Sequence, residues 1–128
     1  MQQAAKTYGK VAKQTVEPRE LEADLLLQAA ARLQAIRDGW DAKQAELDDA
    51  LLYNRKLWSI FVTSVTSPTN PLPVNIRQNI ANLGIFVFNQ TLTTLIDPKP
   101  ELLGSLIHVN RELAAGLRTR PAAPADRI

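Results

Sequence analysis

Cysteine is absent from this chain of 128 residues, and other residue types that catalysis needs are scarce. Without cysteine there are no disulfides, no thiol nucleophile and no thiolate metal site. The single histidine, His108, falls in a leucine-rich stretch, and one imidazole alone makes a poor metal site because such sites need several ligands. The five glycines are scattered singly, so there is no glycine-rich phosphate loop. We therefore expect no enzymatic activity, no metal and no cofactor.

Neither positive nor negative charge predominates strongly in the sequence. The formal net charge is +2, and the basic residues form no dense stripe of the kind that a phosphate backbone attracts. This pattern disfavours direct nucleic-acid binding. The most apolar run, residues 83–88, is too short to span a bilayer. The chain opens on a polar, lysine-bearing stretch, so we expect no signal peptide, no membrane association and a cytoplasmic protein.

Helical periodicity is what the sequence does have, and alternating strand patterns are nearly absent. Proline and glycine fall between the periodic stretches. We expect an all-α protein: a compact bundle of four main helices, with an additional short N-terminal helix and a disordered C-terminal tail. One domain would cover residues 1–118, and the tail, residues 119–128, carries few apolar groups to bury.

The short N-terminal helix is expected over Gln3–Gln14. One side of it would carry Lys6, Lys10 and Lys13. The other side would carry the apolar residues Tyr8, Val11 and Ala12, with Ala4 or Ala5. About three turns of isolated helix are marginal in water, so this segment must dock on something or fray.

The next two expected helices contain the clearest apolar stripes. The second begins at Pro18, because proline suits the first helical position, and ends near Gly39. Its stripe is Leu21, Leu25, Ala29, Leu33, Ile36 and Trp40. The third runs from about Ala42 to Ser64 or Val65. Its seam, at steps of three and four residues, is Leu47, Leu51, Asn54, Trp58, Phe61 and Val65.

Three prolines between residues 68 and 73 end the third helix, since proline cannot continue it. The fourth helix is expected over Val74–Ile96. One apolar stripe on it is Ile76, Ile80, Leu83, Val87 and Leu95. Further apolar residues on its other sides predict a central position in the bundle. Gly84 within this helix is costly unless another helix or a ligand passes close by. The fifth helix is expected over about Lys99–Leu117. Its stripe is Leu102 or Leu103, Leu106, Asn110, Leu113 and Leu117.

Amides and arginines interrupt these apolar helices at several positions. A buried amide needs hydrogen-bond partners, which leaves two interpretations. The favoured one is interhelical hydrogen bonds that fix the register of the bundle. The other is a groove between the third and fourth helices that binds a helical partner. The candidate partner-binding residues are Asn54, Arg55, Trp58, Arg77, Asn79, Asn82 and Gly84.

Five stretches of the sequence stand out, and none of them is a catalytic motif. They are Pro18–Ala23, Ala29–Gln34, Ala50–Trp58, Asn70–Pro73 with Ile76–Gly84, and Asn110–Leu117. These stretches resemble the FlaF family of flagellar biosynthesis regulators. The resemblance extends over residues 5–118, nearly the whole chain.

This resemblance implies a cytoplasmic protein that binds flagellin as an export chaperone and regulates its synthesis and secretion. Flagellin's terminal segments form amphipathic helices that are disordered before assembly, and a helical bundle with an apolar groove could shelter one of them. Two alternatives stay open. One is a post-transcriptional regulator that acts on flagellin messenger RNA, directly or through the partner regulator FlbT. The other is a structural homo-oligomer built on the third-helix seam.

Overall fold

The computed structural model of the protein describes residues 18–119, and no strand occurs among them. The expected all-α bundle of four main helices is confirmed for this part of the chain. The predicted helix over residues 3–14 lies outside the described residues, as do residues 120–128 of the predicted tail. The elements are α2 (Pro18–Asp38), α3 (Trp40–Lys43), the 3₁₀ turn η1 (Gln44–Glu46), α4 (Leu47–Val65), α5 (Val74–Ile96), the 3₁₀ turn η2 (Pro100–Leu102) and α6 (Leu103–Thr119).

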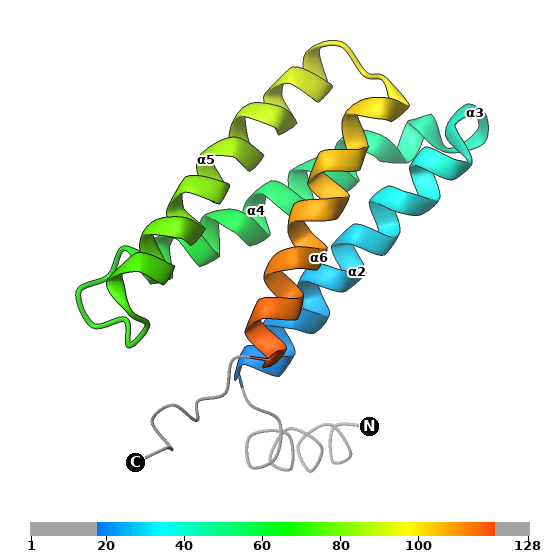
Figure 1. The fold of residues 1–128 in the computed structure, drawn as a ribbon. Helices are drawn as coiled ribbons and strands as arrows, with labels where there is room; N and C mark the ends of the chain where they lie inside the picture. The colour runs from blue at the N-terminus through cyan, green and yellow to red at the C-terminus, as the bar shows by residue number, and fades with distance from the viewer. Residues whose placement is uncertain (1–17, 120–128) are drawn as a thin grey trace, which may run out of the picture.

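The four long helices form two pairs (Figure 1). Helices α2 and α6 pack side by side and run in opposite directions. Helix α4 lies behind this pair, and α5 packs along α4 while touching α6 over only a short stretch. The start of α2 and the end of α6 therefore lie at the same end of the bundle.

Helix α2 begins at Pro18 and ends at Asp38, just before Gly39, as its sequence predicts. The central residues of the predicted stripe, Ala29, Leu33 and Ile36, are buried as expected. The prediction is wrong toward both ends, because Leu21 is 55% exposed while Leu25 and Trp40 are only partly buried. Three alanines on the buried face allow α6 to approach closely, since the side chains at a contact set the distance between helices. The buried residues of α2 are Ala23, Leu26, Ala29, Ala30, Leu33 and Ile36.

Helix α4 starts five residues later than predicted, at Leu47, after the short elements α3 and η1. Neither short element has a buried residue, so no contact with the core favours a longer α4 that would begin before Leu47. Asp48 and Asp49 occupy the first turn of α4, where the helix dipole favours acidic side chains. The predicted seam is confirmed in full: Leu47, Leu51, Asn54, Trp58, Phe61 and Val65 are all buried.

Helix α5 has the predicted bounds but not the predicted place. It lies at the edge of the bundle against α4, and Ile85, Leu92 and Ile96 are 57%, 55% and 74% exposed. Its inner face is narrow and polar in part, with Ile80, Gly84, Val87, Thr91 and Thr94 buried. Apolar residues on most sides of a helix are therefore not sufficient to place it at the centre of the bundle.

Helix α6 completes the core with Leu103, Leu106, Asn110 and Leu117 from its predicted stripe, whereas Leu113 is partly buried. It extends through Thr119, two residues beyond the predicted end. His108 is exposed on this helix. None of the helices in the described range is both long and apolar enough to cross a bilayer.

Candidate functional site

A polar cluster lies in the centre of the core, where α2, α4 and α6 meet. Asn110 is fully buried and accepts a hydrogen bond from Trp58 Nε1 at 2.8 Å through its side-chain oxygen. Its Nδ2 donates to Asn54 Oδ1 at 2.7 Å and to the Leu26 carbonyl oxygen at 3.2 Å. Each contact joins two helices, so the cluster fixes how α2, α4 and α6 align. This is the interhelical hydrogen bonding that the sequence favoured for its buried amides.

Gly84 marks a close approach between α4 and α5. A β-carbon at this position would overlap Val62 Cγ2 and would lie 3.8 Å from Trp58 Cε3. A helix-interior glycine is unfavourable by itself, and here it allows two helix backbones to come together. The expectation that another helix passes close to Gly84 is confirmed, and that helix is α4.

The other predicted site residues are distributed over separate surfaces. Arg55 is exposed on α4, and Asn79 and Asn82 are exposed on α5. Arg77 is partly buried, where its Nε donates to the Leu72 carbonyl oxygen at 3.1 Å and its Nη1 lies 3.5 Å from the Val65 carbonyl oxygen. These bonds tie the proline-containing loop, residues 66–73, to α4 and α5.

The predicted groove between the third and fourth helices is therefore not a single surface. Asn54, Trp58 and Gly84 face the interior and are closed off by neighbouring helices, because α4 and α5 pack too tightly there to leave a gap. A partner cannot contact these three residues in this conformation. Of the seven predicted residues, only Asn79 lines the groove described next.

An apolar groove does exist, but it separates α5 from α6. Two adjoining hollows of about 340 and 260 Å³ form it. They share four residues, which are Leu72, Ile80, Leu113 and Leu117. We call the combined feature the α5–α6 groove. Its remaining lining residues are Pro18, Arg19, Glu22, Phe61, Ser64, Asn70, Pro71, Ile76, Asn79, Leu83, Glu112 and Gly116.

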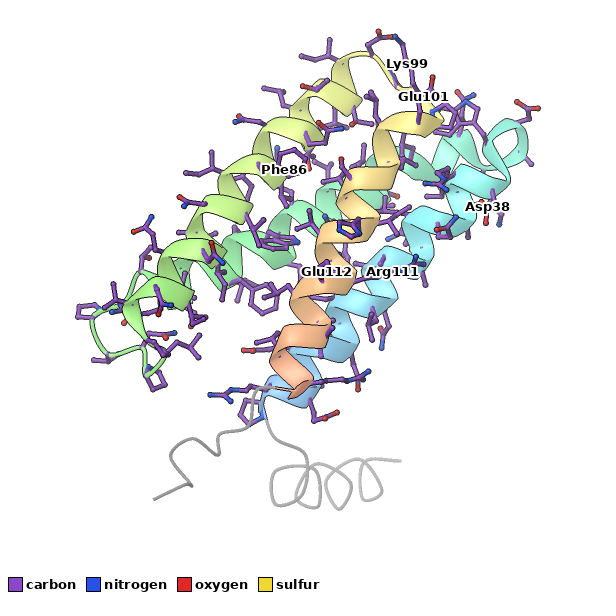
Figure 2. The ribbon with its side chains drawn as sticks, in the orientation of Figure 1. Asp38, Phe86, Lys99, Glu101, Arg111 and Glu112 are labelled. Atoms are coloured by element: carbon purple, nitrogen blue, oxygen red, sulfur yellow. The ribbon has the colours of Figure 1, made fainter. Side chains whose placement is uncertain are left out.

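The floor of the groove rests on the polar cluster. The ring of Phe61 lines the larger hollow and meets the Trp58 ring edge-on, with centroids 6.0 Å apart. Trp58 is held in turn by Asn110. Farther along α5, Phe86 is 39% exposed and lies three residues after Leu83 on the side turned toward α6 (Figure 2). The groove thus has a fixed floor and an open apolar wall.

One end of the groove is closed by the loop and is partly acidic. Asn70 Oδ1 accepts a hydrogen bond from the Leu72 backbone amide at 2.9 Å, and Asn70 Nδ2 donates to the Ser64 carbonyl oxygen at 3.1 Å, which shapes the loop. Burial raises the pKa of the Glu22 carboxyl above its ordinary value, and Arg19 partly opposes this shift. Glu112 adds a second carboxylate on the α6 rim.

Sequence reasoning missed this groove because its residues were assigned to the core. Ile76, Leu83 and Leu113 belong to the predicted stripes, yet each remains partly exposed. One available signal was the excess of apolar positions on α5, whose 23 residues include a single charged residue, Arg77. A helix with more apolar surface than one neighbour can cover leaves a face for another partner.

A family model described as flagellar protein FlaF matches residues 4–117. The chain belongs to the FlaF family. The match spans every described helix as far as Leu117, so both walls of the α5–α6 groove are part of the family domain. No curated protein and no solved structure matches this FlaF-family chain.

Proposed function

We propose that this FlaF-family protein is a cytoplasmic export chaperone for flagellin and a regulator of flagellin synthesis and secretion. It holds an amphipathic terminal segment of flagellin in the α5–α6 groove before export, and it acts by binding without catalysis. The observation that carries this proposal is the groove itself, whose central residues are Leu72, Ile80, Leu113 and Leu117.

The shape and chemistry of the groove suit a helix. Amphipathic helices dock their apolar face into grooves between two helices, with anchors spaced at about one turn. Ile76, Ile80 and Leu83 recur at this spacing on α5, and Leu113 and Leu117 recur on α6. A segment that becomes ordered on binding loses conformational entropy, so affinity should be moderate and release before export should be easy.

Gly116 offers a direct test because it lines the groove, and a β-carbon there would have no atom of another group within 4 Å. Gly116→Gln adds a long polar side chain at the groove lining, and its β-carbon meets no neighbouring group. Glutamine is also a better helix former than glycine, so the fold should be at least as stable. We expect the dissociation constant for flagellin from the same organism, measured by calorimetry, to rise about tenfold, which is ~1.4 kcal/mol.

The matched control is Ala115→Gln, one residue earlier on α6, where the exposed side chain does not line the groove. This variant should bind flagellin like the wild type. Equal flagellin affinity for the two variants would refute the groove as the binding site. No flagellin binding, together with binding of flagellin messenger RNA that falls steeply with salt, would favour the RNA-regulator alternative instead.

A further inference from the structure

We propose that the chain's own N-terminal segment, residues 3–14, docks in the α5–α6 groove and competes there with the flagellin segment. The docking is a property of this chain alone, whereas the competition rests on the proposed function. Three features of the segment support docking: its attachment point, the spacing of its apolar residues and its positive charge.

The attachment point lies at the groove itself. Pro18 and Arg19, the first described residues, line the larger hollow. Only three residues, 15–17, separate Pro18 from the end of the segment, and an extended chain of three residues spans about 10 Å. Such a short tether holds the segment near the groove at a millimolar effective concentration. A weak interaction is therefore enough to fill the site.

The apolar residues of the N-terminal segment have the same spacing as those of the α5 wall of the groove. Ala4, Tyr8 and Val11 follow one another at four and three residues. On α5 the groove residues Ile76, Ile80 and Leu83 have the same spacing. Seven residues of helix cover about 10 Å in each case. A helical segment can thus place its three apolar side chains along the full length of the apolar wall.

The charges are complementary as well. The first sixteen residues carry Lys6, Lys10 and Lys13 and no acidic residue. The groove lining carries the carboxylates Glu22 and Glu112, with Arg19 as its one basic residue. With the apolar stripe docked, the lysines lie on the opposite side of the helix and do not contact these carboxylates. Their positive charge still attracts the segment toward a groove whose lining is acidic on balance, which favours this segment over an acidic one.

Disulfide trapping tests the docking, and the absence of natural cysteine makes it clean. In the full chain, Val11→Cys is combined with Asn79→Cys in the groove lining. The control combines Val11→Cys with Asn89→Cys, which is exposed and lies ten residues farther along α5, outside the groove lining. We expect mild oxidation to link the first pair within one chain at least tenfold faster than the second.

Equal rates for the two pairs, or no linkage, would overturn the docking. Linkage mainly between two chains would overturn it too, because the groove would then be taking a second copy of the protein. Preferential linkage within one chain supports the docking whether or not flagellin binds, so failure of the proposed function is distinguishable from failure of this inference.

The competition has its own measurement. Tyr8→Glu combined with Val11→Glu removes the apolar stripe and leaves all groove residues in place. If the segment occupies the groove about nine-tenths of the time, this variant should bind flagellin about tenfold more tightly than the wild type. Unchanged or weaker flagellin binding would overturn the competition. Lys6→Gln combined with Lys13→Gln, which keeps the stripe, should give a smaller gain.

Discussion

The two faces of α4 that pack against other helices differ in what they accomplish. Toward α2 and α6, α4 presents the buried seam that holds Asn54 and Trp58 in a hydrogen-bonded cluster with Asn110. Toward α5, the contact depends on close approach at Gly84 and leaves much of α5 uncovered. The first contact specifies one arrangement of three helices, whereas the second holds one wall of a groove.

The largest expected effect on stability comes from removing Asn110, the centre of the polar cluster. Asn110→Ala would leave Trp58 Nε1 and Asn54 Oδ1 without their partner in a buried site, and it would also remove the contact of Asn110 with the Leu26 carbonyl oxygen. Each buried polar group left unsatisfied costs about 1–3 kcal/mol, so we expect the free energy of unfolding to fall by about 3 kcal/mol or more. Urea denaturation measures it.

Asn89→Ala is the control for this change, because Asn89 is exposed on α5. Surface substitutions of this kind usually change stability by less than about 0.5 kcal/mol. Similar losses for the two variants would show that the buried cluster has no special role in stability.

A second pair of variants compares two glycines: Gly84, which lies against α4, and Gly116, which faces open space. Gly84→Ala would force its new methyl group into Val62 and push α5 away from α4. Overpacking of this kind costs about 1–3 kcal/mol. Gly116→Ala meets open space and should instead gain about 0.5–1 kcal/mol, because alanine is the better helix former. Thermal denaturation should therefore shift in opposite directions.

The clash at Gly84 can be checked by a double substitution. Val62→Ala removes the side chain that meets the added methyl group, so it should recover part of the stability lost in Gly84→Ala, and the two changes should be strongly non-additive. Additive losses would mean that the α4–α5 distance is set elsewhere.

The smallest expected effect comes from Glu22 at the acidic end of the groove. Its pKa in the folded protein is raised by burial. The carboxyl therefore stabilises the fold fully only below its ordinary pKa of 4.5, and this contribution is lost as pH rises through the raised folded value. Glu22→Gln should slightly raise the unfolding midpoint at neutral pH, and the gain should shrink as the solution is acidified. A constant offset at all pH values would contradict this.

The sequence predicted much of this fold because local signals and packing agree. The prolines between residues 68 and 73 set the end of α4 and the start of α5. The α4 seam was read correctly because its apolar residues and Asn54 all face one interior. The predicted α2 stripe is wrong at its ends because α6 packs against the alanine-containing face of the helix, which is not centred on that stripe. Periodicity within one segment does not show which face a neighbouring helix will cover.

The candidate site was harder to predict for a related reason. Periodicity separates apolar from polar faces, but it does not tell an interior from a groove. Asn54, Trp58 and Gly84 attracted attention as unusual residues, and each serves the packing of α4. Arg77 ties the loop to α4. The groove residues looked ordinary in sequence, and only the limited contact between α5 and α6 leaves them accessible.

The most direct test is hydrogen–deuterium exchange, with and without flagellin, of the full-length Tyr8→Glu, Val11→Glu variant, whose groove is free of the N-terminal segment. We predict that flagellin slows backbone exchange in residues 72–83 and 112–117, the two walls of the α5–α6 groove. Exchange in residues 26–36 of α2, which line no part of the groove, should change little. Slower exchange confined to α2 and the first half of α4, with the groove walls unchanged, would contradict this prediction.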